Sequence, residues 1–368
     1  MSLPNHGQGW RILADDLTGA LDTAAAFSGR GDVPVFLAPP LSAAPVQAVA
    51  TGTRDVRPEA MAATLQACLP WFTAPGYFAF KKIDSLLRGN SLAEVAWLLR
   101  HGGFDAAVFA PGFPAQGRFT RGGQHWVSKP SQAPGVPNQA MALLDAFAAL
   151  GVEACIAHDL ANMPAGGVLV PDVTCDAHLT ELARMADDAE RWLWCGSAGL
   201  AWALARRAQH APLHASLTSS TSSTRSTSPS LTQVVTASRH PVLRGQLAAL
   251  EAIGVHCADL ASAEALAPDA AETALRERTR RLVATLPRPD KLVVIGGDTL
   301  LALCHAAGVQ SLQAGPGPRS GWGAARLQGG VWHGVTCYSR SGAFGAPDDL
   351  SALLATLMVP STEKEHTP

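Results

Sequence analysis

The sequence predicts an α/β protein built from two α/β domains whose largely parallel sheets face a shared cleft. The chain has 368 residues, 47% of them hydrophobic, and short apolar runs alternate with alanine- and leucine-rich helical stretches along its length. A chain this long exceeds one typical core, and alternating strand and helix signals are typical of α/β layers. Ligands of such sheets bind at the carboxyl ends of the strands.

Composition excludes several classes of protein. The formal net charge of −2 gives no basic surface for nucleic acid. No run reaches the roughly 18 apolar residues of a membrane helix, and the N-terminus lacks a basic region followed by an apolar stretch. The seven cysteines are scattered without a CxxC pair, which indicates reduced thiols and argues against zinc. We therefore expect a cytoplasmic protein without membrane or nucleic-acid partners; a homo-oligomer is compatible with the sequence.

The first polar cluster follows the first predicted strand. Residues 11–14 read as a strand and residues 21–27 as a helix, so Asp15 and Asp16 lie in the turn between them. One carboxylate can accept a proton from a substrate hydroxyl while the other caps the helix. The competing interpretation is that Asp16 or Thr18 is simply an N-cap.

A second polar cluster, Lys-Lys-Ile-Asp-Ser-Leu-Leu-Arg-Gly-Asn at 81–90, follows a predicted strand at 77–82. Arg54 also follows a predicted strand, at 46–51. Lysine and arginine beside one turn are suited to an anionic ligand, since arginine can hold a carboxylate through two parallel hydrogen bonds. A solvated surface loop is the alternative. Residues 111–125, with Arg118, Arg121 and His125, read as a long irregular functional loop.

The second half of the chain repeats the α/β pattern after a stretch dominated by Ser and Thr. We expect a first domain at 1–210, a linker or loop at 211–231 and a second domain at 232–368.

In this second domain, polar or glycine-rich turns follow predicted strands at 233–237, 291–295 and 334–338. Glycines let the backbone approach a ligand, and free amides at a helix start favour an anion, so these turns indicate a phosphate or nucleotide cradle. The sequence has no GxxxxGK[ST] and no GxSxG motif. Gly315–Gly321 has the wrong spacing and too many prolines for a dinucleotide fingerprint.

Taken in order, these stretches resemble the four-carbon acid sugar kinases over nearly the whole chain. The matching blocks are Ala14–Ala20, Lys81–Asn90, Ala110–Arg118 with Gly122–His125, Gly196–Ala201, and then Ser238, Gly296–Thr299 and Arg340–Gly345. The sequence departs from the family where Leu86 replaces threonine and Arg340 replaces lysine.

The resemblance implies an ATP-dependent kinase that phosphorylates a terminal hydroxyl of threonate, erythronate or a 3-oxo-tetronate. The first domain would hold the sugar acid and the second would hold ATP with Mg²⁺. Asp16 is the leading candidate for the base, and Asp15 and Asp84 are its rivals. The expected substrate-binding residues are Arg54, Lys82, Arg88, Ser85 and His125, and the expected nucleotide-binding residues are Ser238, Gly296, Gly297, Asp298, Thr299, Arg340 and Gly342. The alternative is a catalytically impaired relative that binds nucleotide or sugar acid in a regulatory role.

Overall fold

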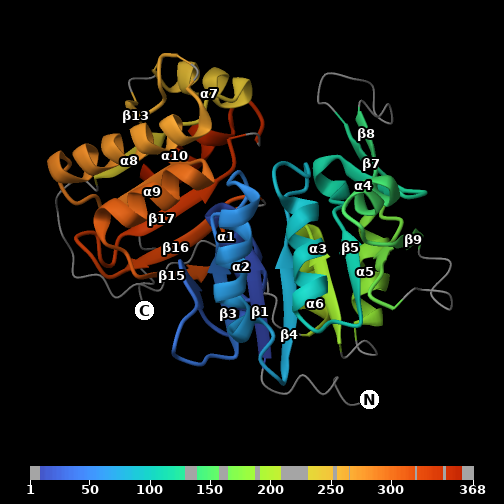
Figure 1. Ribbon diagram of the computed structural model, residues 1–368. Helices are drawn as coiled ribbons and strands as arrows, with labels where there is room; N and C mark the ends of the chain where they lie inside the picture. Colours follow the sequence, from blue (N-terminus) through green and yellow to red (C-terminus); the bar gives the residue numbers. More distant parts are fainter. Residues whose placement is uncertain are drawn as a thin grey trace, which may run out of the picture. The chain divides into compact units, whose positions relative to one another are not determined.

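The computed structural model divides into two compact units, which we describe separately (Figure 1). Unit 1 comprises residues 1–214 with 311–316, and unit 2 comprises residues 215–310 with 317–368. The structure describes residues 9–128, 139–156, 165–186, 191–208, 231–251, 255–264, 266–319, 321–342 and 345–358. Residues 211–230 of the expected linker lie outside these ranges. The segment Ser311–Pro316 lies within the expected second domain, 232–368, but belongs to unit 1.

Unit 1 is built from alternating strands and helices. Its main strands are β1 (Gly9–Ala14), β2 (Val33–Phe36), β3 (Val46–Ala50), β4 (Tyr77–Lys82), β5 (Ala106–Ala110), β9 (Ala154–Ile156), β10 (Val168–Val170), β11 (Trp192–Gly196) and β15 (Ser311–Gly315). Its helices are α1 (Leu17–Ala26), α2 (Pro58–Phe72), α3 (Ser91–His101), α4 (Leu143–Ala149), α5 (Asp176–Met185) and α6 (Ala198–Arg207), with 3-10 turns η1 (Ser28–Arg30) and η2 (Pro114–Gln116).

The strands of unit 1 form one sheet in the order β15-β2-β3-β1-β4-β11-β5-β10-β9. All neighbours pair in parallel except β15, which runs antiparallel to β2. In β1, Trp10 is in register with both Val46 of β3 and Phe78 of β4. The carboxyl ends of β1, β3 and β4 are therefore neighbours, and the polar turns that follow them meet there.

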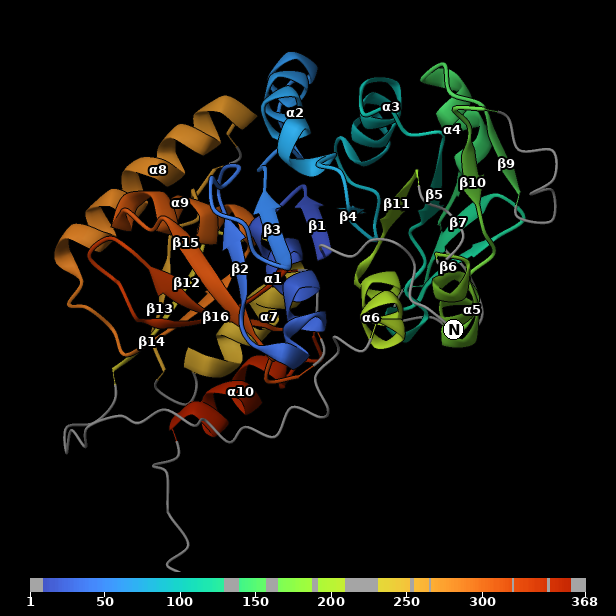
Figure 2. The ribbon, with the colours of Figure 1, turned by 90° about the horizontal axis from the view of Figure 1, so that it is seen from below.

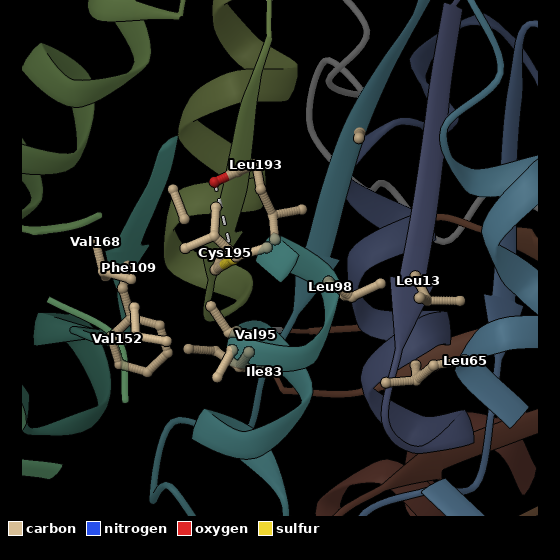
Figure 3. Packing of buried hydrophobic residues seen from close by; sticks show 14 of the residues in the cluster. Leu13, Leu65, Ile83, Val95, Leu98, Phe109, Val152, Val168, Leu193 and Cys195 are labelled. Atoms are coloured by element: carbon tan, nitrogen blue, oxygen red, sulfur yellow. Dashed lines mark hydrogen bonds between the residues drawn. The ribbon is translucent and has the colours of Figure 1, made fainter. Parts of the chain in front are cut away.

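Helices cover both faces of this sheet. Helices α2, α3 and α4 lie on one face and α1, α5 and α6 on the other (Figure 2). Because both faces are covered, successive residues of β1 such as Ile12 and Leu13 are both fully buried. Figure 3 shows the core under α2 and α3, where Leu65 and Leu98 pack with Leu13 and other apolar residues of the sheet.

The predicted irregular loop at 111–125 is instead partly a β-hairpin. Strands β6 (Arg118–Arg121), β7 (Gln124–Val127) and β8 (Gln139–Ala142) form a separate antiparallel sheet. Gly122 and Gly123 connect the first two strands with φ of 56° and 73°. Two left-handed residues in a two-residue turn match the twist of a hairpin, and glycine adopts them without strain. The Gly-Gly pair was the sequence signal for this hairpin.

Unit 2 is a smaller α/β layer structure. Its strands are β12 (Thr232–Thr236), β13 (Cys257–Asp259), β14 (Lys291–Ile295), β16 (Gly323–Gln328) and β17 (Thr336–Arg340), and its helices are α7 (Pro241–Glu251), α8 (Pro268–Thr285), α9 (Gly297–Ala307) and α10 (Asp349–Met358). The sheet order is β13-β12-β14-β17-β16, parallel except for β16. Helices α7 and α10 pack on one face, where Leu243, Leu250 and Leu353 meet Val234 and Val293 of the sheet.

The α/β class predicted from the sequence is confirmed. The shared cleft between two domains stays a prediction. Within the ranges that the structure describes, no helix has the length and apolar character needed to span a bilayer. Among the described residues, the cysteines at positions 68, 175, 195, 257, 304 and 337 are free thiols.

The core under α3 provides a first test of this packing. Leu98 has no exposed surface, whereas Leu41 is fully exposed. We expect Leu98→Ala to lower the free energy of unfolding by about 2–5 kcal/mol, because it leaves a cavity between α3 and the sheet. The matched control, Leu41→Ala, should change it by less than about 0.5 kcal/mol. Urea denaturation of both variants would check this, and equal midpoints would contradict the packing described here.

Candidate active site

The turn from β1 into α1 is built around Asp16, which is the N-cap of the helix. One of its oxygens, Oδ1, accepts a hydrogen bond from Gly19 N at 2.8 Å, and Oδ2 accepts one from Thr18 Oγ1 at 2.6 Å. The backbone of Asp16 is extended, with φ of −141°. A side-chain oxygen that accepts from an amide of the first turn is the usual N-cap arrangement. Asp16 therefore caps α1, and its role as a base stays a prediction.

Arg54, in the turn after β3, holds both acids of this motif. Its Nε and Nη2 donate to the two oxygens of Asp15 at 2.7 and 3.0 Å, and its Nη1 donates to Asp16 Oδ2 at 2.9 Å. The Asp15 side chain is only 1% exposed. All three guanidinium nitrogens are thus engaged, so Arg54 fixes the β1–α1 turn against the β3 turn.

These contacts keep Asp16 ionised. Burial by itself would raise the pKa of Asp16, but the charges of Arg54 and Lys82, with the hydrogen bonds from Thr18 and Gly19, bring this pKa below its usual value. Burial likewise opposes the charge of Arg54, yet Asp16 and Asp15 raise the pKa of the guanidinium well above its usual value.

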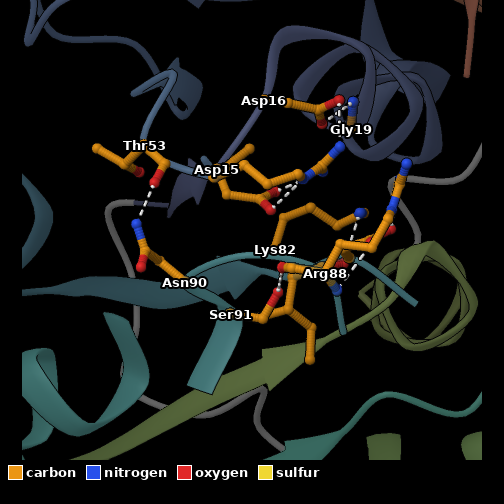
Figure 4. Close-up of polar contacts among 12 residues, drawn as sticks. Asp15, Asp16, Gly19, Thr53, Lys82, Arg88, Asn90 and Ser91 are labelled. Atoms are coloured by element: carbon orange, nitrogen blue, oxygen red, sulfur yellow. Dashed lines mark hydrogen bonds and ion pairs between the residues drawn. The ribbon is translucent and has the colours of Figure 1, made fainter. Parts of the chain in front are cut away.

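The turn after β4 carries the third acid, Asp84, and its partner Arg88 (Figure 4). Arg88 donates through Nε to Asp84 Oδ2 at 2.6 Å and through Nη2 to Oδ1 at 3.1 Å, and its backbone N–H also donates to Oδ2. Burial opposes ionisation of Asp84, but Arg88, Arg54 and Lys82 more than offset it and depress its pKa strongly. Leu87, between these two residues, has a φ of 55°. Such a conformation is strained for a leucine, and strained residues are typical of functional sites.

This turn docks tightly onto the turn that carries Arg54. Asn90 donates from its backbone to Arg54 O at 2.8 Å and from its side chain to the carbonyls of Thr53 and Val56, each at 2.8 Å. Gly89 approaches so closely that a Cβ there would lie 1.9 Å from Arg54 O. The turns after β1, β3 and β4 therefore form one connected unit.

The two adjacent lysines of β4 serve different faces of the sheet, because successive side chains of a strand point to opposite sides. Lys81 forms a fully buried ion pair with Glu94 of α3 at 2.6 Å. The Lys82 ammonium donates to Ile83 O at 2.7 Å and lies near Gly19 of α1, since a Cβ on Gly19 would be 3.1 Å from it. In Figure 4 it lies between the Asp15–Asp16 turn and Arg88. Lys82 therefore faces the candidate site, and Lys81 belongs to the core.

Ser85 and His125 connect this turn to the small antiparallel sheet. His125 of β7 is 2% exposed, and its Nε2 lies 2.9 Å from Ser85 O. Burial lowers the pKa of His125, which favours the neutral imidazole. Arg118 of β6 is close enough to interact electrostatically with Asp84 and Arg88. The structure thus brings all the predicted residues of unit 1 into one cluster.

In unit 2, the three predicted nucleotide-binding turns meet at the ends of the adjacent strands β12, β14 and β17. Ala237 N donates to Thr299 Oγ1 at 3.1 Å, and a Cβ on Gly342 would lie 2.4 Å from Ser238 Oγ. Gly296, with φ of 116°, is the N-cap of α9, and no side chain caps this helix. Gly297, Asp298 and Thr299 form its first turn. The uncapped amides of a helix start are suited to an anion.

Arg340 has a different environment from the one we predicted. It is 2% exposed, its guanidinium lies 4.9 Å from the Trp322 ring centre, and it contacts Asp349 at 3.2 Å and the Gln246 side chain. Burial lowers its pKa to about 10 despite Asp349. The prediction that Arg340 binds phosphate is not supported by this packing, because the side chain is enclosed in the core of unit 2.

Sequence reasoning did not single out Glu94, Asn90 or Asp22. Asn90 stood inside the 81–90 motif, and its two carbonyl contacts depend on a turn far away in sequence. Glu94 and Asp22 are the single acids of α3 and α1, two helices in which most residues are apolar. A lone acid in such a helix was the available signal.

The chain is similar in sequence to a family of domains and to several kinases. The model of a family described as a sugar-binding N-terminal domain matches residues 10–143. Over 128 residues (32% of this chain, 30% of the relative) the chain is 44% identical to D-threonate kinase of Cupriavidus necator. It is 36% identical over 119 residues (31% and 28%) to the D-threonate kinase of Salmonella typhimurium. These two alignments span less than a third of either relative's length.

A third relative, D-threonate kinase of Bordetella bronchiseptica, is 30% identical over 371 residues, covering 94% of this chain and 85% of the relative. A crystal structure from Salmonella typhimurium LT2 has a TM-score of 0.67 at 18% identity, over 92% of this chain and 97% of that one, and so shares the fold. A Haemophilus influenzae protein of the DUF1537 family has a TM-score of 0.62, also at 18% identity and with the same coverage.

The fold is an α/β fold, and residues 10–143 match the family of sugar-binding N-terminal domains. The chain belongs to the four-carbon acid sugar kinase family.

The close approach at Gly89 generates a second prediction. Gly89 and Gly122 have nearly the same left-handed φ, 59° and 56°, but a Cβ on Gly122 would meet nothing within 4 Å. Gly122→Ala should therefore lose only about 1 kcal/mol of unfolding free energy, the strain of a left-handed alanine. Gly89→Ala should lose clearly more, because its Cβ forces the Arg54 turn to move. Denaturation curves for the two variants measure the difference; equal losses would contradict the docking of these turns.

Proposed function

We propose that this protein is a kinase that transfers the γ-phosphoryl group of ATP to a terminal hydroxyl of a four-carbon sugar acid of the threonate, erythronate or 3-oxo-tetronate type. The observation that carries the proposal is the cluster of Asp15, Asp16, Asp84, Lys82 and Arg88 at the carboxyl ends of β1 and β4. It lies in the unit whose sequence matches a sugar-binding domain. The D-threonate kinase relatives support the four-carbon acid as the substrate class.

The substrate carboxylate needs a cation with donors to spare. Arg54 spends all three of its nitrogens on Asp15 and Asp16. Arg88 uses Nε and Nη2 on Asp84, and its side chain is 43% exposed, so its Nη1 can reach a ligand. Lys82 donates one hydrogen bond, to Ile83 O, and an ammonium has three donors. We therefore assign the carboxylate to Lys82 and Arg88, and to Arg54 the role of ordering the site.

Unit 2 offers the place for ATP. The uncapped start of α9 at Gly296 and Gly297, beside Ser238 and Gly342, presents backbone amides without bulky side chains. Amides at a helix start bind phosphate oxygens. In the part of the chain that the structure describes, no group of three His, Cys, Asp or Glu side chains is placed to hold a metal ion. Mg²⁺ typically binds through substrate phosphates with one or two carboxylates, so we expect it to enter as the ATP complex.

Phosphoryl transfer depends mainly on position and charge. Lys82 and Arg88 would hold the sugar acid by its carboxylate, and the terminal hydroxyl would face the γ-phosphorus. The strained turn at Leu87, fixed by Asn90 and Gly89 to the Arg54 turn, keeps these groups in place before substrate arrives.

The direct experiment combines purified protein with ATP, Mg²⁺ and a panel of four-carbon sugar acids, with ADP release as the measurement. We expect turnover with at least one of them. Nucleotide or sugar-acid binding without turnover across the panel would instead support the regulatory relative.

The cation assignment predicts how Arg88 variants behave. Arg88→Ala should raise the KM for the sugar acid by roughly 10- to 100-fold, since a hydrogen bond to a charged group contributes about 1.5–3 kcal/mol. Arg88→Lys keeps the charge but loses the forked guanidinium, so its KM should lie between those of the wild type and Arg88→Ala. Arg191→Ala removes a 66% exposed arginine of the same unit and should leave the KM unchanged. Steady-state kinetics measure all three, and an unaltered KM in Arg88→Ala would rule out this residue as the anion site.

The nucleotide assignment predicts the effect of a side chain at the start of α9. Gly297→Val would cover the free amides and should weaken ATP binding by roughly tenfold or more, about 1.4 kcal/mol. The control Gly245→Val lies in α7, where a Cβ would meet nothing within 4 Å. Calorimetry with a non-hydrolysable ATP analogue measures both. An unchanged affinity for the ATP analogue in a correctly folded Gly297→Val variant would show that the phosphates do not bind at this helix start.

A further inference from the structure

Helix α1 presents one part-exposed face beside the acid cluster. Of its ten residues, all but Gly19 and Asp22 are buried. Residues three apart lie on the same face of a helix, so Asp22 follows Gly19 by one turn on that face. Gly19 is bordered by Asp16 Oδ1 and the Lys82 ammonium, 2.5 and 3.1 Å from where its Cβ would be. Asp22 is therefore an acid at the edge of the proposed sugar-acid site.

The three acids that the sequence suggested as bases are all committed to other contacts. Both oxygens of Asp15 accept from Arg54, and both oxygens of Asp84 accept from Arg88. Asp16 accepts from Gly19, Thr18 and Arg54. A carboxylate whose two oxygens both accept hydrogen bonds, at least one of them from an arginine, is a weak proton acceptor, because protonation would disrupt this bonding.

Asp22 has none of these contacts. Among the described residues it makes no hydrogen bond and no ion pair, and the charged groups that act on it are Lys82 and Asp16. Burial raises the pKa of Asp22 to about 6, with the Lys82 ammonium opposing this rise and Asp16 adding to it. A carboxylate with these properties is ionised at neutral pH yet accepts a proton more readily than its neighbours.

The other elements that pack against α1 bring little further charge to Asp22. Strands β2, β3 and β15 carry no charged residue. In β1, Arg11 stacks on Tyr77 and Trp71 instead. Helix α6 has its charges in its last turn, at Arg206 and Arg207, and η1 ends at Arg30.

We propose that Asp22, and not Asp16, accepts the proton of the substrate hydroxyl. The inference rests on the kinase function proposed above. The hydroxyl oxygen forms its bond to the γ-phosphorus of ATP as the bond between this phosphorus and the β–γ bridging oxygen breaks. ADP leaves with that electron pair, and the hydroxyl proton passes to the Asp22 carboxylate. Lys82, whose charge acts on Asp22, holds the substrate by its carboxylate and keeps the acid ionised between turnovers.

The test is Asp22→Asn, which keeps the shape of the side chain and removes the base. We expect kcat to fall by about 10²- to 10⁴-fold, the usual range for a general base, with little change in the KM for the sugar acid. In the wild type, the rate should fall as the pH drops below about 6, where Asp22 binds its proton. That acidic limb of the pH–rate profile should be absent from the residual activity of the variant. Because burial disfavours the charged form, the variant should be at least as resistant to urea at pH 7 as the wild type.

Two further variants make the result decisive. Asp145→Asn, an exposed acid of α4, should leave both kcat and the acidic limb unchanged. Asp16→Asn should lose activity but retain the limb, since Asp16 orders Arg54. If Asp22→Asn keeps a wild-type kcat, or if the limb disappears in Asp16→Asn instead, the inference is overturned. Absence of turnover in the wild type with every sugar acid would contradict the kinase proposal itself, which is a separate outcome.

Discussion

The candidate site depends on the Arg54 guanidinium, which holds Asp15 and Asp16 from the neighbouring turn. Three donors in a rigid plane match the oxygens of two carboxylates, a geometry that a lysine does not reproduce. The carbonyl of the same residue accepts from Asn90, so the third turn is fixed to the same point. Two adjacent buried acids would repel each other without this cation. One residue thus sets the arrangement of the site, with three of its five N–H groups committed to the two acids.

Much of the fold could be predicted, because periodicity and turn residues are local signals. The buried strands at 77–82 and 291–295 coincide with β4 and β14. The strands that the sequence analysis did not predict depend on partners elsewhere in the chain. Strand β15 is recognised through its pairing with β2. The hairpin at Gly122 and Gly123 lies in a stretch rich in glycine and arginine, which reads as an irregular loop.

The residues of the candidate site could also be predicted, but their separate roles could not. The motif places Lys81 and Lys82 together, and the pleat of β4 sends one to Glu94 and the other to the cluster. Asp16 reads equally as a cap and as a base, and the contacts with Thr18 and Gly19 establish the cap. Arg340 reads as a phosphate ligand in a glycine-rich turn, yet Trp322 and Asp349 enclose it. Which face a charge occupies is decided by tertiary packing.

The strand β15 has a consequence for how the chain can be divided. Ser311–Gly315 pairs antiparallel with β2, although unit 1 apart from residues 311–316 precedes residue 215. A fragment that ends near residue 210 would leave the N–H and C=O groups of β2 open to solvent. An open edge is a template for pairing with another chain, and the proline in β2, Pro34, blocks only one position of it. Unit 1 is therefore completed by a short segment from late in the sequence, and expression of the first 210 residues alone would give a molecule prone to self-association.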